Sequence, residues 1–247
     1  AQAAWAEFQQ IESEGGLVES LVAGKVQARI AEKRVALMKD VARRKTPVTG
    51  VSEFPLLDEI AAPVADVSRP LRGDGVDPIG LKTLLPDFEE VRGDDTIAEP
   101  FTWISIAEPF ETLRDRSEDH MSKTGARPSV FLATIGPLAE HTGRADFARN
   151  FFAAGGIEAK AAPVPPKSVS ELAAAFKASG CKIAVLCGAD KRYAEEAAEA
   201  AGALKDAGAV ALWLAGKHEA DGVDRQIFMG CDTVHELTVA LAELGVS

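Results

Sequence analysis

The chain has 247 residues, of which 47% are apolar and 26% charged, a composition typical of a globular protein with a sizeable core. Its net charge of −11 argues against nucleic-acid binding, which requires a basic face. No stretch approaches the ~18 uninterrupted apolar residues of a membrane helix. We therefore expect neither nucleic acid nor a membrane among its partners.

The first five residues have neither the basic start nor the apolar run of a secretory signal. There is no initiator Met, so we expect a fragment or a processed chain. The three cysteines, Cys181, Cys187 and Cys231, form no CxxC pair, and their number is odd. This usage favours buried, reduced thiols in a cytoplasmic protein.

Residues 1–47 form the first region, which is predicted to be helical. Trp5, Phe8 and Ile11 recur every three residues, the pattern of a helix with one buried face. The apolar faces of this region are narrow, so its helices make a poor independent core and we expect them to pack on something else. The first predicted helix ends at Gly15-Gly16, and two more cover about 17–23 and 25–45.

Residues 48–126 form an acidic, proline-rich region in which frequent prolines make long helices unfavourable. The region still holds large apolar side chains such as Phe54, Phe88 and Trp103, which disordered linkers usually lack. We interpret it as an ordered strap lying across another surface, with a helix near 109–123 that Thr124-Gly125 ends.

Residues 127–247 alternate five short apolar runs with helical segments, one of which opens with the capping box Ser168 and Glu171. Alternation of this kind means right-handed crossovers and a parallel sheet covered on both faces. The count and the loop lengths predict an α/β domain of flavodoxin-like, doubly wound type. The predicted strands are 129–134, 157–161, 182–187, 209–214 and 226–229, and the helices between and after them are about 144–154, 168–179, 191–207 and 232–244.

In such sheets ligands bind beyond the carboxyl ends of the strands. The loops to inspect are therefore 135–143, 187–191, 215–225 and 229–233.

The first of these loops resembles the cobalamin loop of the methylmalonyl-CoA mutase family. That family carries Asp-x-His-x-x-Gly there; the His ligates cobalt and the Asp orients the imidazole. Gly136 and Gly143 bracket the loop at the family's spacing. The Asp position, however, falls on Leu138 and the His position on Glu140, while His141 is one residue late and no register shift restores the motif.

The other loops resemble the family in part. Cys187-Gly188 follows the third strand where the family has Ser-x-Leu, and Ala215-Gly216 replaces the Gly-Gly pair after the fourth. The turn after the fifth strand keeps Gly230. We read these positions as vestiges of a cofactor loop and expect no bound cofactor, no bound metal and no catalytic residue in this chain.

The chemistry of the first loop carries that expectation. Leu138 cannot accept a hydrogen bond from an imidazole. Glu140 offers a carboxylate where the family uses a nitrogen ligand, which is a mismatch of ligand type.

The rest of the chain resembles the same family. Segments 4–8 and 11–16 resemble the end of the mutase substrate barrel, and 49–55 resembles the start of the inter-domain strap. Segments 110–115 and 228–230 resemble most the small, non-catalytic subunit of the heterodimeric bacterial mutase.

The resemblance implies an isomerase of propionate metabolism that interconverts methylmalonyl-CoA and succinyl-CoA with adenosylcobalamin, which supplies the radical. The large subunit then carries the catalysis and the cobalt, and the small subunit stabilises it as its heterodimeric partner. A complete barrel needs ~250 residues, so residues 1–47 supply only its final elements and cannot bind CoA in the family's way.

Two alternatives remain open: a cobalamin-binding module that uses the degenerate loop, and an unrelated flavodoxin-like enzyme that uses the same cleft. Cys187 as a nucleophile and Lys217 as an anion contact are weaker candidates, for which a buried thiol and a solvated lysine are the favoured readings. Asp190 is expected to cap a helix. His120, His218 and His235 lie far apart in the sequence, with no Cys or His at metal-ligand spacing.

Overall fold

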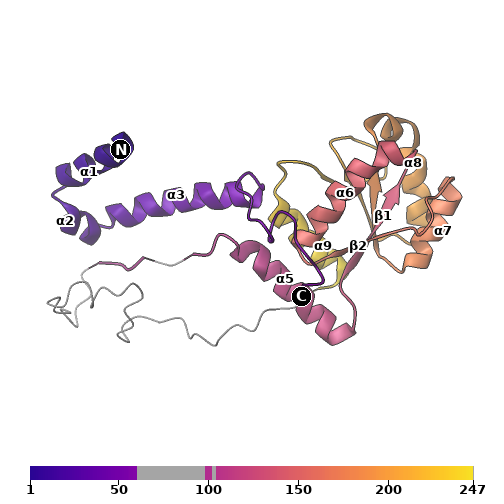
Figure 1. Ribbon diagram of the computed structural model, residues 1–247, viewed down its shortest axis with the longest axis horizontal. Coiled ribbons are helices and arrows are strands. Elements are labelled where there is room, and N and C mark those ends of the chain that lie inside the picture. The colour runs from indigo at the N-terminus through magenta and orange to yellow at the C-terminus, as the bar shows by residue number, and fades with distance from the viewer. Residues whose placement is uncertain (60–97, 102–103, 247) are drawn as a thin grey trace. The chain divides into compact units, whose positions relative to one another are not determined.

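The computed structural model describes residues 1–59, 98–101 and 104–246 (Figure 1). The chain divides into two compact units, Ala1–Ala31 with Asp58–Thr102 and Glu32–Leu57 with Trp103–Ser247. Most of the predicted strap, including Phe88 and Trp103, lies outside the described residues. Each unit is considered by itself below.

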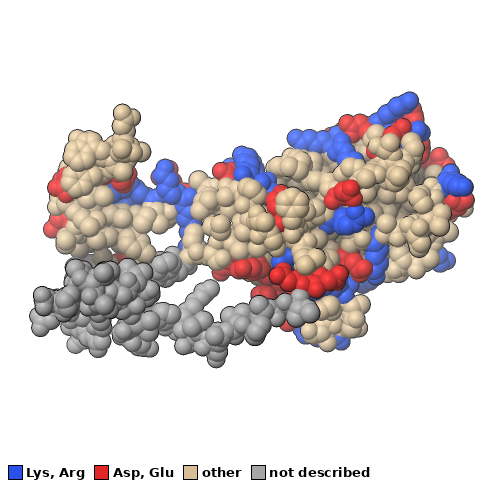
Figure 2. Space-filling model, viewed as in Figure 1, with Lys and Arg blue, Asp and Glu red and all other residues tan. Residues whose placement is uncertain are grey.

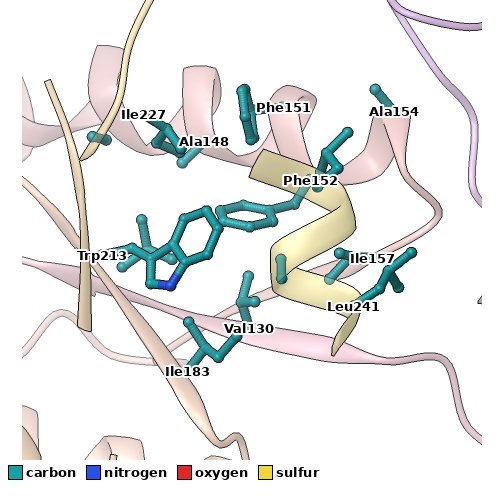
Figure 3. Packing of buried hydrophobic residues seen from close by; sticks show 14 of the residues in the cluster. Val130, Ala148, Phe151, Phe152, Ala154, Ile157, Ile183, Trp213, Ile227 and Leu241 are labelled. Carbon is teal, nitrogen blue, oxygen red and sulfur yellow. The ribbon is translucent and has the colours of Figure 1, made fainter. Parts of the chain in front are cut away.

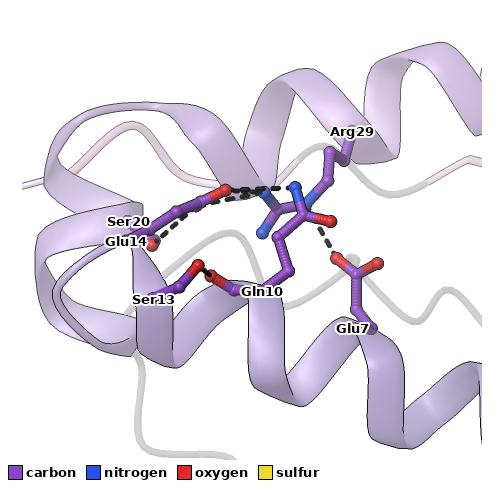
Figure 4. Close-up of polar contacts among 6 residues, drawn as sticks. All are labelled: Glu7, Gln10, Ser13, Glu14, Ser20 and Arg29. Atoms are coloured by element: carbon purple, nitrogen blue, oxygen red, sulfur yellow. Dashed lines mark hydrogen bonds and ion pairs between the residues drawn. The ribbon is translucent and has the colours of Figure 1, made fainter.

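The first unit contains helices α1 (Gln2–Ser13), α2 (Leu17–Val22) and the start of α3 (Lys25–Ala42). A polar cluster joins these helices (Figure 4). Arg29 lies 2.7 Å from Glu7 and 3.0 Å from Glu14, and Glu14 also accepts hydrogen bonds from Gln10 and Ser20, each at 3.1 Å. These bonds, Gln10 first and Arg29 second, lower the pKa of Glu14.

The apolar face of α1 is exposed, so the predicted burial of that face is wrong for this chain. Trp5 stacks on Phe8 at 5.3 Å between ring centroids, yet the two side chains are 60% and 51% exposed. α1 has no buried residue, because among the described residues of this unit no second layer covers its apolar face. Further exposed apolar residues of the first unit are Leu17, Val18, Val22 and Ile30.

The second unit is built on a five-stranded parallel sheet, which confirms the predicted flavodoxin-like α/β fold. The strand order is β2-β1-β3-β4-β5, and every neighbouring pair is parallel. β2 lies at one edge, and its side chains are partly or fully exposed. The strands are β1 (Ser129–Thr134), β2 (Glu158–Ala161), β3 (Ile183–Cys187), β4 (Ala211–Ala215) and β5 (Arg225–Ile227).

Helices cover both faces of this sheet (Figure 1). One face is covered by α5 (Glu108–Thr124), α6 (Leu138–Ala154) and α9 (Thr233–Leu244), and the other by α7 (Val169–Ser179) and α8 (Asp190–Asp206). Central strands that are buried on both faces read as continuous apolar runs, and β3 and β4 are fully buried.

The core on the first face is centred on Trp213 (Figure 3). Its indole lies 5.7 Å from the ring of Phe152 between centroids, and the indole Nε1–H donates to Glu243 at 3.0 Å. A buried indole needs such an acceptor, since its N–H would otherwise lose its hydrogen bond to water.

Two helices of this unit, α7 and α9, are capped by side chains at their N-termini. The Ser168 hydroxyl accepts from the Glu171 amide at 3.2 Å, and the Glu171 carboxylate accepts from the Lys167 amide at 2.8 Å, so the predicted box forms one residue wider than expected. Asp232 caps α9 by accepting from the His235 amide at 3.0 Å.

Arg44 ends α3 in the left-handed region, with φ of +57°. Glycine is the usual residue at such a position because a Cβ is strained there. The arginine is held by its side chain, which is only 7% exposed, lies 2.7 Å from Glu53 and donates to the Asn150 side chain of α6. The side chain thus fixes the end of α3 to the α/β domain.

α5 is attached to the same domain by buried and partly buried bonds. The fully buried Ser117 hydroxyl donates to the Gly156 carbonyl at 2.6 Å. Arg114 donates to Gly50 at 3.3 Å and Arg127 to Leu57 at 2.8 Å, so the described start of the strap lies along α5. Acidic side chains gather on the exposed face of α5 (Figure 2), namely Glu108, Glu111, Asp115, Glu118 and Asp119.

In the part of the chain that the structure describes, no helix is both long enough and apolar enough to span a bilayer.

Candidate functional site

The strand order reverses between β1 and β3, so a ligand crevice is expected beyond the carboxyl ends of these two strands. The segments that meet there start at Ile135 after β1, at Gly188 after β3 and at Gly216 after β4. We call this region the crevice.

The segment after β1 is helical from Leu138 onward, so the predicted start of that helix at 144 is wrong. Pro137 takes an extended conformation just before the first turn, and Glu140 places a negative charge within that turn, where the helix dipole favours it. The vestigial positions Leu138, Glu140 and Gly143 therefore lie on α6 and not in a loop.

Leu138 and the two glycines offer no donor or acceptor side chain to a metal. Leu138 is 69% exposed at the first position of α6. Gly136 has φ of +80°, which allows the tight turn from β1 into the helix, and Gly143 is helical with open space beside it.

Glu140 is engaged by an arginine of α8. Its carboxylate lies 2.6 Å from Arg192 Nε, and Arg192 also donates to Glu196 at 2.9 Å. The hydrogen bond from Arg192 is the largest cause of the lowered pKa of Glu140. Glu140 is thus a charged partner in an ion pair.

His141 is folded back onto its own turn. Its Nδ1 lies 3.0 Å from the Gly136 carbonyl, and the residue is only 6% exposed. A carbonyl accepts, so Nδ1 carries the proton, and in the neutral ring the lone pair is on Nε2.

A second ion pair joins α6 to α8. Arg144 donates to Asp190 at 3.0 Å. Asp190 is the first residue of α8 and not its N-cap, which is Ala189, so the prediction of a cap at Asp190 is wrong. The carboxylate binds across to α6 instead of bonding its own helix.

The ends of β3 and β4 are joined by Tyr193, which is 2% exposed. Its hydroxyl accepts from the Gly188 amide at 2.9 Å and lies 2.9 Å from the Ala215 carbonyl and 3.2 Å from that of Leu186. Burial raises the pKa of Tyr193, so the hydroxyl keeps its proton. The Tyr193 hydroxyl thus contacts the backbone of β3, of β4 and of the turn after β3.

Cys187 lies at the end of β3 and is fully buried. Burial raises the pKa of its thiol to about 12, which removes the thiolate that a nucleophile needs. Its Sγ lies 3.5 Å from the Val185 carbonyl. Among the described residues no basic side chain bonds it, so the reading of Cys187 as a buried structural thiol fits its surroundings.

The fourth and fifth turns carry the remaining vestigial positions. Ala215 is buried in β4, and the Gly216 amide donates to the Ile227 carbonyl at 2.8 Å. Gly230 has φ of +88° and open space beside it. Lys217 lies over the Phe228 ring, 4.5 Å from its centroid, so it contacts an aromatic face.

Metal chemistry has little support among the described residues, where no three His, Cys, Asp or Glu side chains come together. His218 lies beside the Tyr193 ring, 5.7 Å between centroids, and lines a shallow hollow of about 450 Å³ between α8 and the loop after β4. His235 is in the first turn of α9 and His120 in α5, so the three histidines are not brought together.

Sequence reasoning missed Tyr193, Arg144 and Arg192. Tyr193 is the only tyrosine of the chain and stands four residues before Ala197 on the buried side of α8, a pattern that was available in the sequence. The two arginines are spaced like any surface cations, and only the fold reveals their partners.

Taken together, the sheet order, the helices on both faces and the glycines at the strand ends define a flavodoxin-like α/β domain of the class that holds ligands at its carboxyl edge. A family model described as methylmalonyl-CoA mutase matches residues 1–72. The chain is a homologue of the methylmalonyl-CoA mutase small subunits, as its motifs predicted.

Three relatives illustrate the similarity. The methylmalonyl-CoA mutase small subunit of Streptomyces virginiae is 43% identical over 247 residues, which is 100% of this chain and 36% of the relative. The probable small subunit of Mycobacterium tuberculosis (strain H37Rv) is 37% identical over 227 residues, 90% of this chain and 30% of the relative. The small subunit of Propionibacterium freudenreichii subsp. shermanii is 33% identical over 256 residues, covering 100% of this chain and 35% of the relative.

The chain therefore spans only 30% to 36% of the length of these relatives.

Proposed function

We propose that this chain is the C-terminal portion of the non-catalytic small subunit of an adenosylcobalamin-dependent methylmalonyl-CoA mutase. In this proposal it stabilises the catalytic large subunit, which carries out the isomerisation of methylmalonyl-CoA and succinyl-CoA, and it binds no cofactor itself. The observation that carries the proposal is the state of the first crevice segment, where Glu140 lies in an α-helix and is paired with Arg192.

Adenosylcobalamin does not fit the residues of this crevice. The cobalamin loop of the mutase family places an imidazole at the position of Glu140 and a carboxylate at that of Leu138, and this chain has neither. His141 stands one residue later and is only 6% exposed, with its imidazole folded back onto the Gly136 carbonyl.

The helical segment 1–47 is proposed to be the final part of a barrel. The exposed stack of Trp5 and Phe8 supports this, because a large exposed apolar surface marks a place where further polypeptide packs. The match of the mutase family model to residues 1–72 and the greater length of the relatives are consistent with it.

The proposed partner is the mutase large subunit, since relatives named small subunits imply a larger one. The acidic, exposed face of α5 suits a basic surface on such a partner (Figure 2).

Two measurements test the proposal. In the first, the chain is incubated with hydroxocobalamin and passed through gel filtration, with absorbance showing where the corrinoid elutes; the mutase large subunit is the positive control. We expect the corrinoid to elute apart from the chain. Its retention would instead support a cobalamin-binding module with a degenerate loop.

In the second measurement, the large subunit is expressed in the native host with and without the gene that encodes this chain. We expect co-purification of the two polypeptides and a higher melting temperature of the large subunit when both are present. A large subunit that is equally stable alone and recovers no partner contradicts the stabilising role.

A further inference from the structure

The crevice of this domain is filled by side chains of the chain itself. Tyr193 enters it from α8, and its hydroxyl meets one amide and two carbonyls at the ends of β3 and β4, all within 3.2 Å. The Gly188 amide and the Ala215 carbonyl lie at the carboxyl edge of the sheet, where ligands bind in domains of this class.

Two arginines lie directly on the glycines of the crevice. A Cβ added at Gly216 would lie 2.8 Å from Nη1 of Arg144 and 3.4 Å from Cε2 of Tyr193. A Cβ added at Gly136 would lie 3.0 Å from Cγ and from Nε of Arg192. Glycine at such positions allows a ligand to approach the backbone, and here the arginine and tyrosine side chains use that space.

The same arginines hold the crevice closed. Arg192 pairs with Glu140 at 2.6 Å and Arg144 with Asp190 at 3.0 Å, so two ion pairs run between α6 and α8 across the carboxyl ends of the strands. A ligand that entered would have to break both pairs and expel Tyr193 from its three backbone contacts.

We propose that the crevice is self-occupied: Tyr193, assisted by Arg144 and Arg192, replaces a small-molecule ligand within the fold. The inference rests on the proposed cofactor-free function and deepens it, because it names the groups that exclude ligands of any kind from this crevice. Once Tyr193 is removed, the crevice accepts a phenol shaped like the tyrosine side chain.

The test replaces Tyr193 and supplies its side chain in solution. Tyr193→Ala lowers the melting temperature and leaves a cavity with an apolar wall and a polar end. p-Cresol, which has the shape of the missing side chain, raises the melting temperature of this variant in a concentration-dependent way, as linkage requires. Toluene lacks the hydroxyl and binds about tenfold more weakly, because the backbone groups stay unpaired. Neither compound shifts the wild-type chain.

Phe176→Ala provides a matched control. Phe176 is also 2% exposed and lies in the same apolar cluster as Tyr193, but its ring has no hydroxyl. In this variant p-cresol has no advantage over toluene. Equal effects of the two compounds on Tyr193→Ala would show that its polar contacts are not those of a ligand and would overturn the proposal.

A second variant serves if Tyr193→Ala does not fold. Tyr193→Phe keeps the ring and removes the hydroxyl, and hydrogen exchange of the Gly188 amide then becomes faster while that of Val185 within β3 is unchanged. Unaltered exchange at Gly188 overturns the proposal.

Corrinoid retained by the wild-type chain overturns the cofactor-free function. If p-cresol fails to stabilise Tyr193→Ala while the wild-type chain still excludes corrinoid, only the proposal of a self-occupied crevice is overturned.

Discussion

Gly156 gives the most direct prediction about how α5 is held on the α/β domain. It has φ of +76°, and a Cβ added to it would lie 2.7 Å from Cβ and 2.9 Å from Oγ of Ser117. Ser117 is fully buried and bonds the Gly156 carbonyl at 2.6 Å, so it cannot turn away without losing that bond. Gly156→Ala therefore combines backbone strain with a clash.

The magnitude follows from these two contributions. A side chain in the left-handed region costs about 1 kcal/mol, and overpacking of a closed contact costs about 2 kcal/mol more. The free energy of unfolding should fall by about 3 kcal/mol, which for a chain of this length lowers the melting temperature by about 6–12 °C. Urea denaturation followed by circular dichroism measures the free energy.

Gly180→Ala is the matched control, because Gly180 has φ of +69° and nothing within 4 Å of an added Cβ. It should cost only about 1 kcal/mol, the strain alone. Ser117→Gly removes both clashing atoms, so in that background Gly156→Ala should cost about as little as the control. If Gly156→Ala costs no more than Gly180→Ala in the wild-type background, the close contact with Ser117 does not hold α5 in place and the reasoning fails.

Three further predictions concern charge and exposure. Arg44→Ala should lower the free energy of unfolding by about 2 kcal/mol through loss of the pair with Glu53. Arg44→Gly should lower it by about 1 kcal/mol less, because glycine accepts the positive φ. Equal losses of unfolding free energy in the two variants, measured by denaturation, would argue against backbone strain at this residue. The pKa of Glu140 is lower in the folded chain than its value near 4.5 in the unfolded chain, so its pair with Arg192 stabilises the fold above pH 4.5 and is lost as the pH falls through the lowered pKa. The difference in melting temperature between the wild type and Glu140→Gln should therefore shrink below pH 4.5. A difference that is constant with pH contradicts the pairing. The thiol of Cys187 is buried and has a pKa of about 12, so it should react with a disulfide reagent at pH 8 only as fast as the chain unfolds. Rapid labelling of Cys187 in the native chain, detected by mass spectrometry, would refute its burial.

Much of the fold could be predicted because apolar runs and turn residues agree along the second unit. The run from Ile183 to Cys187 is apolar throughout, and the structure buries all of it in a central strand. The start of α6 could not be predicted, because Gly136 and Gly143 bracket a segment that matches a loop of related proteins. Its residues Leu138 to Glu140 are good helix formers, and the pair with Arg192, 52 residues away, favours the helix.

The exposure of Trp5 illustrates a different limit. The spacing of apolar residues predicts which face of a helix is apolar, but burial depends on whether a second layer is present to cover it. In the same way, the sequence indicates where the crevice lies, and the long-range contacts of Tyr193 determine what fills it.

The edge strand β2 has a consequence for assembly. It has four residues, and Glu158 and Lys160 pair at 3.7 Å along its open border. Short, charged borders discourage another polypeptide from adding a strand by backbone pairing. We therefore expect that no second polypeptide extends the sheet by pairing with β2, and that any contact on this side of the domain forms through side chains of helices or loops.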